Sequence, residues 1–237
     1  MIDASVSAVA RNPRTRHLVV VGLGLLVFWG FWASRPWWSA DMRLWKAVGD
    51  TSLVLLVVTL ALGPLARLRP GTGRWLPWRR ETGVWFGIAA GIHTVLVLNG
   101  WAQWSLERLF GFEFVPQLGR TARMEPGFGL ANLLGLIAMV WTAALVVTST
   151  QRAVRRLGPR AWKWLHNATN TIFYLVTAHV AYFLFLHYAR SFHRDPPPPD
   201  WFRVPFLVLA TSVILLQIAA FIRTVQRDRR TPRRRRT

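Results

Sequence analysis

The chain has 237 residues, of which 52% are hydrophobic and only 17% are charged, and its formal net charge is +20. It contains no cysteine, which excludes disulfides, cysteine-ligated iron–sulfur clusters and covalently attached c-type haem. The apolar residues are gathered into runs of about 20, the length that an α-helix needs to cross a bilayer. We therefore predict an all-α integral membrane protein rather than a soluble domain, whose core could not hide such runs in a chain this short.

Six apolar runs are long enough to be membrane-spanning helices. In chain order they cover residues 17–34, 44–65, 82–101, 127–150, 162–187 and 202–224. The predicted fold is one six-helix transmembrane domain over residues 17–224, with residues 1–16 and 225–237 as polar tails. The first run comes after a polar, Arg-containing lead, and no small-residue cleavage site clearly follows the run. We therefore interpret it as a retained span rather than a signal peptide.

Lys and Arg residues are unevenly distributed between the connecting segments. Of the 30, 21 lie in residues 1–16, 67–80, 151–163 and 223–237, which are alternate connections. The positive-inside rule then predicts a multi-pass protein of the cell membrane with both termini in the cytoplasm. Because the basic residues adjoin apolar spans, the charge is explained by topology and by contact with anionic lipid, and nucleic-acid binding is not predicted.

Two connections on the predicted outer side stand out. Residues 105–126 mix Phe, Gly and charged residues, and we expect them to cover the outer face of the bundle. Residues 189–200 contain four consecutive prolines, which favour a stiff, extended spacer over a docking segment.

Histidines at membrane depth are the candidate functional residues, because a buried imidazole is costly without a partner. His93 lies about 11 residues into the third span and His179 about 16 residues into the fifth. Both spans run from the inner to the outer side, so the two side chains can meet at similar depth. Two facing neutral imidazoles suit the axial positions of a low-spin haem iron. The spacing equally allows two unrelated histidines, each hydrogen-bonded to a neighbouring helix.

His166 precedes His179 by 13 residues, which places it about 19.5 Å lower and roughly 140° around the helix. One haem cannot use both. His166 is therefore a ligand of a separate inner site, a contact of haem propionates, or a boundary residue, and His17 is the other inner imidazole. We interpret His187 and His193 as solvated edge residues, with a border position at an outer cofactor as the alternative for His187.

Other polar or small residues have more than one interpretation. The glycines of the third span recur every four residues and predict close helix packing on the face opposite His93. Asp50, the one acidic residue within a predicted span, suits a proton relay or a polar ligand, or is a shallow residue reached by water. Arg79 and Arg80 suit propionate partners or topology charges. The glycines are Gly83, Gly87 and Gly91.

Several segments carry a family resemblance. Residues 59–68 (TLALGPLARL) and 79–84 (RRETGV), followed by His93, resemble the ferric-reductase-like transmembrane superfamily. Residues 148–174 (TSTQRAVRRLGPRAWKWLHNATNTIFY), with His179 after them, are similar to its MsrQ (YedZ) branch. The resemblance covers roughly residues 45–190, most of the chain.

This resemblance implies a b-type cytochrome whose spans two to five hold haem, with the first and last helices peripheral. It implies that His93, His166 and His179 are haem-iron ligands, that one or two haem b groups are bound, and that FMN or a quinone is a further candidate cofactor. Electrons would come from a cytoplasmic flavin reductase or quinol and pass to a periplasmic molybdenum enzyme, MsrP, which reduces methionine sulfoxide. The chain would be the electron-transfer subunit of this oxidoreductase system.

Two alternative functions remain open at this level. A transmembrane ferric or other metal reductase would act directly on a small oxidant at the outer face. A haem-free helical transporter or assembly factor would use the same spans without a redox cofactor. The length of residues 105–126 and the proline-rich connection differ from the MsrQ pattern, and they leave the outer acceptor open.

Overall fold

The computed structural model describes residues 12–123, 125, 127–187 and 199–230. Within these residues, six helices or helix series are long and apolar enough to cross a membrane, which confirms the predicted number of spans. They are α2 (Pro13–Ala33), α3 (Ala40–Leu68), α4 (Trp78–Asn99), α6 (Phe128–Val147), the series α8 (Pro159–Asn167), α9 (Thr169–Ala181) and η3 (Tyr182–Leu186), and α10 (Arg203–Arg230).

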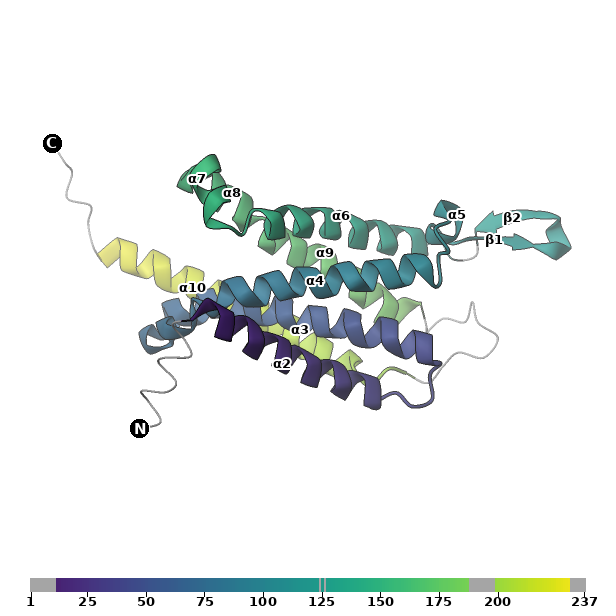
Figure 1. Cartoon of the computed structure of the whole chain (residues 1–237), viewed down its shortest axis with the longest axis horizontal. Coiled ribbons are helices and arrows are strands. Elements are labelled where there is room, and N and C mark those ends of the chain that lie inside the picture. The colour runs from purple at the N-terminus through teal and green to yellow at the C-terminus, as the bar shows by residue number, and fades with distance from the viewer. Residues whose placement is uncertain (1–11, 124, 126, 188–198, 231–237) are drawn as a thin grey trace.

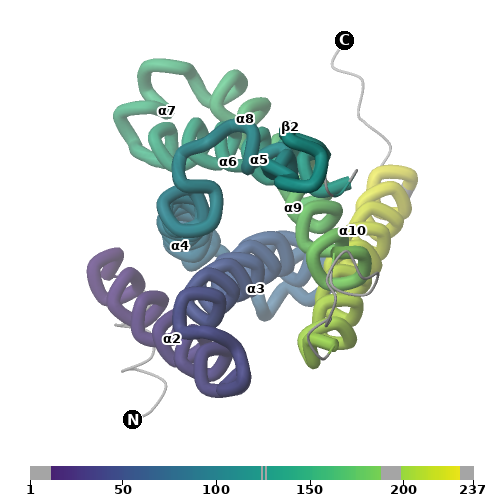
Figure 2. Tube along the Cα trace, turned by 90° about the vertical axis from the view of Figure 1, so that its right-hand side faces the viewer, coloured from purple at the N-terminus to yellow at the C-terminus, as the bar shows by residue number. Residues whose placement is uncertain are grey.

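Four of these spans form a closed ring. Helix α3 contacts α4, α4 contacts α6, α6 contacts α9, and α9 returns to α3. Helix α2 packs outside this ring on α3 and α4, and α10 packs outside it on α3 (Figure 2). The predicted core of spans two to five, with peripheral first and last helices, is therefore the observed arrangement.

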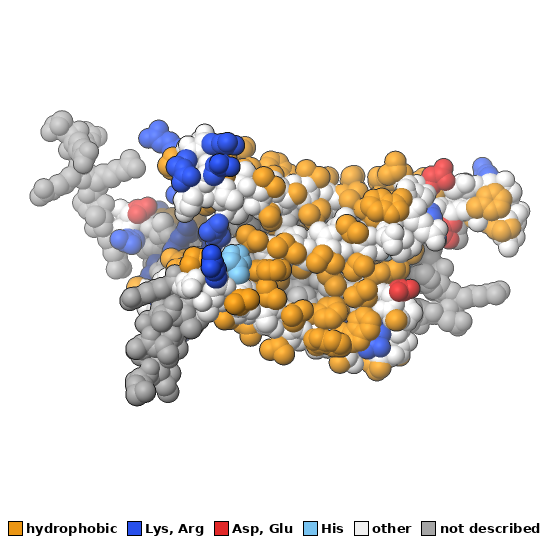
Figure 3. All heavy atoms as spheres, viewed as in Figure 1, with side chains coloured by type: hydrophobic (Ala, Val, Ile, Leu, Met, Phe, Trp, Pro, Cys, Tyr) orange, Lys and Arg blue, Asp and Glu red, His pale blue; other side chains and the backbone are white. Residues whose placement is uncertain are grey.

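Helix α3 supplies much of the interior because it touches the most neighbours. Its residues Leu53, Leu56 and Leu60 are at most 3% exposed, and Ile172 and Phe173 of α9 are fully buried in the same cluster. The outward faces of the other helices are also apolar, as the band of hydrophobic side chains across the middle of the molecule shows (Figure 3). Exposed apolar side chains on α2, α4, α6 and α10 suit a bundle whose solvent is lipid.

The two ends of the bundle differ in charge. Lys and Arg side chains gather where α2 begins and α10 ends, near η1 (Pro70–Trp75) and α7 (Gln151–Leu157) (Figures 1 and 3). We call this the basic end. The opposite end is called the hairpin end because two strands, β1 (Phe112–Val115) and β2 (Arg120–Arg123), extend from it as an antiparallel pair (Figure 1).

The hairpin end shows structure that the sequence did not predict. A short helix, α5 (Leu106–Leu109), precedes β1, and the 3₁₀ turn η2 (Pro116–Leu118) joins the strands. Gly119, with φ of +57°, closes the turn in a conformation that favours glycine. The Asn132 side-chain amide donates to the Leu109 carbonyl over 2.8 Å and ties α5 to the start of α6.

The third span begins earlier than predicted. Helix α4 starts at Trp78 rather than at residue 82, so Glu81 lies inside its first turn and is fully buried. Its Oε1 accepts from Arg16 Nη2 over 2.9 Å. The prediction that Asp50 is the one acidic residue within a span was therefore wrong. The proline-rich segment and His193 lie outside the described residues, apart from Pro199 and Asp200.

Candidate functional site

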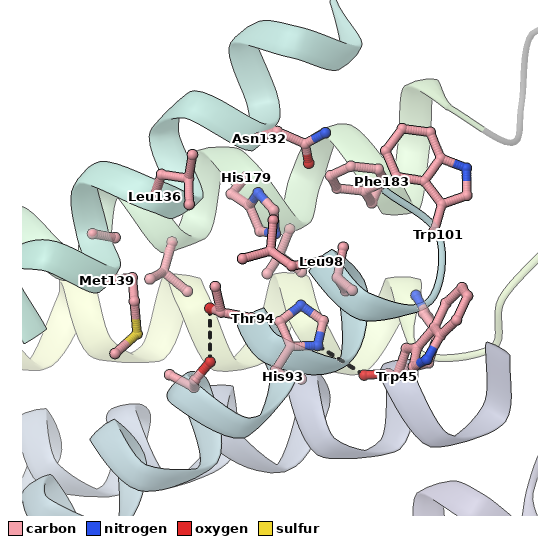
Figure 4. A pocket seen from close by; sticks show the side chains of 18 of the residues that line it. Trp45, His93, Thr94, Leu98, Trp101, Asn132, Leu136, Met139, His179 and Phe183 are labelled. Carbon is pink, nitrogen blue, oxygen red and sulfur yellow. Dashed lines mark hydrogen bonds between the residues drawn. The ribbon is translucent and has the colours of Figure 1, made fainter. Parts of the chain in front are cut away.

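A cavity of about 540 Å³ lies within the four-helix ring. That volume falls in the range of pockets that hold cofactors and drug-sized ligands, roughly 300–1,000 Å³. Its walls come from α3, α4, α6 and α9, and Leu109, Gly111 and Glu113 of the hairpin end line it as well. The predicted cover of the outer face is therefore part of the cavity wall. His93 and His179 line the cavity together, as Figure 4 shows.

His93 is held by the helix that faces it. Its Nδ1 lies 2.9 Å from the Trp45 carbonyl oxygen of α3 (Figure 4). The ring lies so close to Gly49 that a β-carbon there would lie 3.0 Å from both Nδ1 and Cε1. The position of the His93 ring is therefore set by α3, and one of its two ring nitrogens is hydrogen-bonded to the backbone.

His179 is held in the same way by α6. Its Nδ1 lies 2.8 Å from the Ala131 carbonyl oxygen, and a β-carbon on Gly135 would lie 2.9 Å from that nitrogen. The structure thus brings His93 and His179 to one cavity from two different helices.

The partners of the two rings determine their tautomers. A carbonyl oxygen can only accept, so each Nδ1 carries the hydrogen and donates it. In a neutral imidazole the other nitrogen, Nε2, then has a free lone pair. Both residues can therefore offer Nε2 to a metal centre in the cavity, the arrangement in which a ligating histidine donates its second nitrogen to a backbone carbonyl.

His166 lies elsewhere, at the basic end on α8. Its ring stacks on Trp162 with 4.0 Å between centroids, and its Nε2 lies 3.2 Å from Thr148 Oγ1 at the end of α6. It is half-buried and does not line the cavity of the other two histidines. This separation agrees with the prediction that one haem cannot use both His166 and His179.

His17 does not face His166. Its Nδ1 accepts from Trp85 Nε1 over 3.1 Å, on the side of α4 that contacts α2. Figure 2 shows α2 and α8 on opposite sides of α4.

Arg80 donates to the Ser149 carbonyl over 2.9 Å, which ties the start of α4 to the end of α6.

His187 is a cavity residue rather than a solvated edge residue. Its Nδ1 lies 2.7 Å from Glu125 Oε2, and the Tyr182 hydroxyl donates to the other oxygen of the same carboxylate. Glu125 is 6% exposed and lines the cavity together with His187. The favoured prediction was wrong because Glu125 comes from the connection after β2, whose position helical spacing could not indicate.

Buried charges form a network beside the cavity at the hairpin end. Arg35, which is 1% exposed, places Nη2 at 2.6 Å from Asp50 Oδ2 and 3.0 Å from Asp200 Oδ1. Lys46 Nζ lies 3.0 Å from Asp200 Oδ2. Burial alone would raise the pKa of Asp200, but Lys46 and Arg35 outweigh it and hold that pKa below its ordinary value. Asp50 is thus an ion-paired residue of the cavity wall rather than a water-exposed one.

The three regularly spaced glycines of α4 all face neighbouring helices. A β-carbon on Gly87 would lie 2.3 Å from Val146 of α6, and one on Gly91 would lie 3.6 Å from Met139 of the same helix. Gly83 faces Thr59 of α3 at 3.4 Å. These contacts agree with the predicted role of the glycines in helix packing.

A bundle of six membrane-spanning helices, four of which surround a cofactor-sized cavity with imidazoles on its walls, defines a cofactor-binding membrane protein. The family described as "Ferric reductase like transmembrane component" matches residues 48–177, more than half of the chain. The chain belongs to this family.

Three relatives place the chain in the MsrQ branch of the family. A protein of Enterobacter sp. (strain 638) is 33% identical over 160 residues, which cover 66% of this chain and 73% of the relative. Proteins of Salmonella paratyphi B and Salmonella newport are each 32% identical over 200 residues, 83% of this chain and 87% of the relative. Each of the three is named "Protein-methionine-sulfoxide reductase heme-binding subunit MsrQ".

Proposed function

We propose that this protein is a haem b-binding electron-transfer subunit in which His93 and His179 are the two axial ligands of one haem. The observation that carries the proposal is the matched state of the two imidazoles. Each donates through Nδ1 to a backbone carbonyl and retains the Nε2 lone pair, and both line the same cavity. The names of the relatives support haem as the group between them.

The cavity fits such a group in size and chemistry. Its volume of about 540 Å³ is lined by mostly apolar side chains, among them Phe86, Leu136 and Val176. Among the described residues of its wall, Lys46 is the only Lys or Arg, and it lies toward the hairpin end. We assign Lys46 as the counter-charge for a haem propionate in addition to its ion pair with Asp200, because a buried carboxylate needs a paired cation.

A haem held here supplies a one-electron couple between ferric and ferrous iron. The chain supplies the rest. The Trp45 and Ala131 carbonyls hold the tautomer and orientation of the two imidazoles, and the mostly apolar wall would limit the water around a bound haem. The network of Arg35, Lys46, Asp50 and Asp200 sets fixed charges beside the site.

We further propose that His166 is a ligand or near-ligand of a second haem at the basic end. Its half-buried ring beside Trp162, remote from the first cavity, supports a separate site. FMN or a quinone is the candidate group if no second haem is bound.

We propose that electrons enter at the basic end and leave at the hairpin end. The basic residues support a cytoplasmic position for the basic end, which would place both termini inside the cell. The membrane is then the cell membrane. The donor is then a cytoplasmic flavin reductase or a quinol, and the acceptor an outer, MsrP-like molybdenum enzyme. Two alternative functions are direct reduction of ferric iron at the hairpin end and a haem-free role as a transporter or assembly factor.

Absorption spectroscopy of the purified protein tests the central proposal. We expect a Soret band, with a sharp α-band on dithionite reduction. Absence of both contradicts haem binding and favours the transporter alternative. Once haem is established, oxidation of the reduced protein by a methionine-sulfoxide reductase or by a ferric chelate distinguishes an electron carrier for a partner from a metal reductase.

A further inference from the structure

We infer that Gly49 and Gly135 are matched positioning residues for the two proposed haem ligands. Each glycine, together with the backbone carbonyl one helical turn before it, forms a seat that sets the orientation of one haem-ligating imidazole. This inference rests on the proposed function, because the rings it orients are the proposed ligands. A carbonyl–glycine seat is defined as the Trp45 carbonyl with Gly49, for His93, or the Ala131 carbonyl with Gly135, for His179.

The two seats have the same construction. In each, the accepting carbonyl belongs to the residue four positions before the glycine, on the helix that descends from the hairpin end. In each, the acceptor precedes the histidine by 48 positions, and the histidine lies on the next membrane-spanning helix or helix series. The pairs α3–α4 and α6–α9 thus present their histidines to the cavity in equivalent ways.

The glycine is needed because the ring lies directly on the helix backbone. A β-carbon at position 49 would lie 3.0 Å from Nδ1 and Cε1 of His93. A β-carbon at position 135 would lie 2.9 Å from Nδ1 and 3.0 Å from Cε1 of His179. Favourable carbon contacts are about 3.5–4.0 Å, so any larger residue must push the ring away from the helix.

A ring bound to iron cannot move freely to accept that push. It is held at Nε2 by the metal and at Nδ1 by the carbonyl, so a displacement lengthens or tilts one of these two bonds. The Nδ1–H···O bond raises the basicity of the ligand and so favours the ferric state. Weakening it in a Gly→Ala variant is expected to raise the midpoint potential of the haem.

The size of the effect follows from the strength of such outer contacts. Loss of an outer-shell partner typically costs about 10-fold to 100-fold in metal affinity. If the ferric state loses about 10-fold more than the ferrous state, the midpoint potential rises by about 59 mV, the one-electron equivalent of a factor of ten.

The test compares Gly49→Ala and Gly135→Ala with the control Gly91→Ala in the full-length, haem-loaded protein. A β-carbon on Gly91, two residues before His93, meets only the end of the Met139 side chain at 3.6 Å, an ordinary contact. The control therefore introduces the same methyl group into the same membrane core without touching an imidazole.

We expect both seat variants to shift the electron paramagnetic resonance g-values of the low-spin ferric haem, which report ring orientation, and to raise the midpoint potential. The control should match the wild type in both. If Gly135→Ala does not accumulate, Gly49→Ala, with the looser contact, carries the test. Wild-type g-values and potential in Gly49→Ala overturn the inference while leaving haem binding intact. A wild-type protein without a Soret band instead contradicts the proposed function itself.

Discussion

Arg35 and Asp200 are 165 residues apart in the sequence, yet their side chains form a buried ion pair with 3.0 Å between Nη2 and Oδ1. Arg35 belongs to the connection between α2 and α3, and Asp200 lies three residues before the start of α10. The pair therefore joins the two peripheral helices at the hairpin end, beside the wall of the cavity. Its Asp50 contact extends this link to α3, the helix at the centre of the bundle.

Replacement of Asp200 by Asn should destabilise the protein by about 3 kcal/mol at neutral pH, because Lys46 and Arg35 lose a buried negative partner. The pKa of Asp200 is lowered in the folded state, so its contribution is fully present above the unfolded value of about 3.9 and is lost only as the pH falls through the lower, folded value. Thermal unfolding in detergent should thus show a constant difference from pH 8 to pH 5.

The matched control for this prediction is Asp228→Asn, which removes an exposed carboxylate near the end of α10. It should leave the thermal unfolding unchanged. A difference between wild type and Asp200→Asn that disappears already at pH 6 would contradict the assigned direction of the pKa.

Replacement of either His93 or His179 by Ala should abolish the low-spin spectrum of the haem in the cavity. Removing one axial nitrogen leaves the iron five-coordinate or lets the haem dissociate, and the Soret and α-bands report both. His17→Ala is the control, because that imidazole contacts Trp85 on the α2 side of α4. Full retention of the low-spin haem in both cavity variants would show that the ligand pair is assigned wrongly.

Replacement of His166 by Ala should lower the haem content from about two groups per chain to about one, without changing the spectrum of the His93–His179 haem. The physical reason is distance, since His166 lies outside the cavity, at the basic end. Haem extraction per chain measures the loss, with Trp164→Phe on the same helix as control. A wild-type protein with a single haem that survives in His166→Ala would rule out the second haem.

Reporter fusions should place the basic end in the cytoplasm. Alkaline phosphatase inserted at Gly119, in the turn of the β-hairpin, is expected to be active because that enzyme folds only outside the cytoplasm. The same insertion at Gly73 in η1 should be inactive. Activity at Gly73 with inactivity at Gly119 would reverse the proposed orientation and the direction of electron flow.

Much of the fold could be predicted because its signals are local. A run of about 20 apolar residues is a spanning helix wherever it occurs, so the six spans and their approximate bounds followed from the sequence. The depth of a histidine along its helix follows from the rise per residue, which is why His93 and His179 were expected at similar height and His166 well below them.

The rest depended on contacts between distant segments. The burial of Glu81 within a span was not predicted, because the basic residues before it suggested that α4 begins later. Its partner Arg16 lies at the start of another helix, so the sequence around Glu81 does not indicate the ion pair. His187 was assigned to the surface because nothing in the spacing of its own helix indicates that Glu125 would close over it.

The class of protein, the number of spans and the candidate histidines could be predicted from local patterns, because hydrophobic length and helical rise are properties of each segment alone. The three-dimensional packing was needed to show which nitrogen of each imidazole is occupied, that Gly49 and Gly135 lie against the two rings, and that Arg35 pairs with Asp200. Those features depend on the rotation and close approach of neighbouring helices, which side-chain packing sets across the whole bundle.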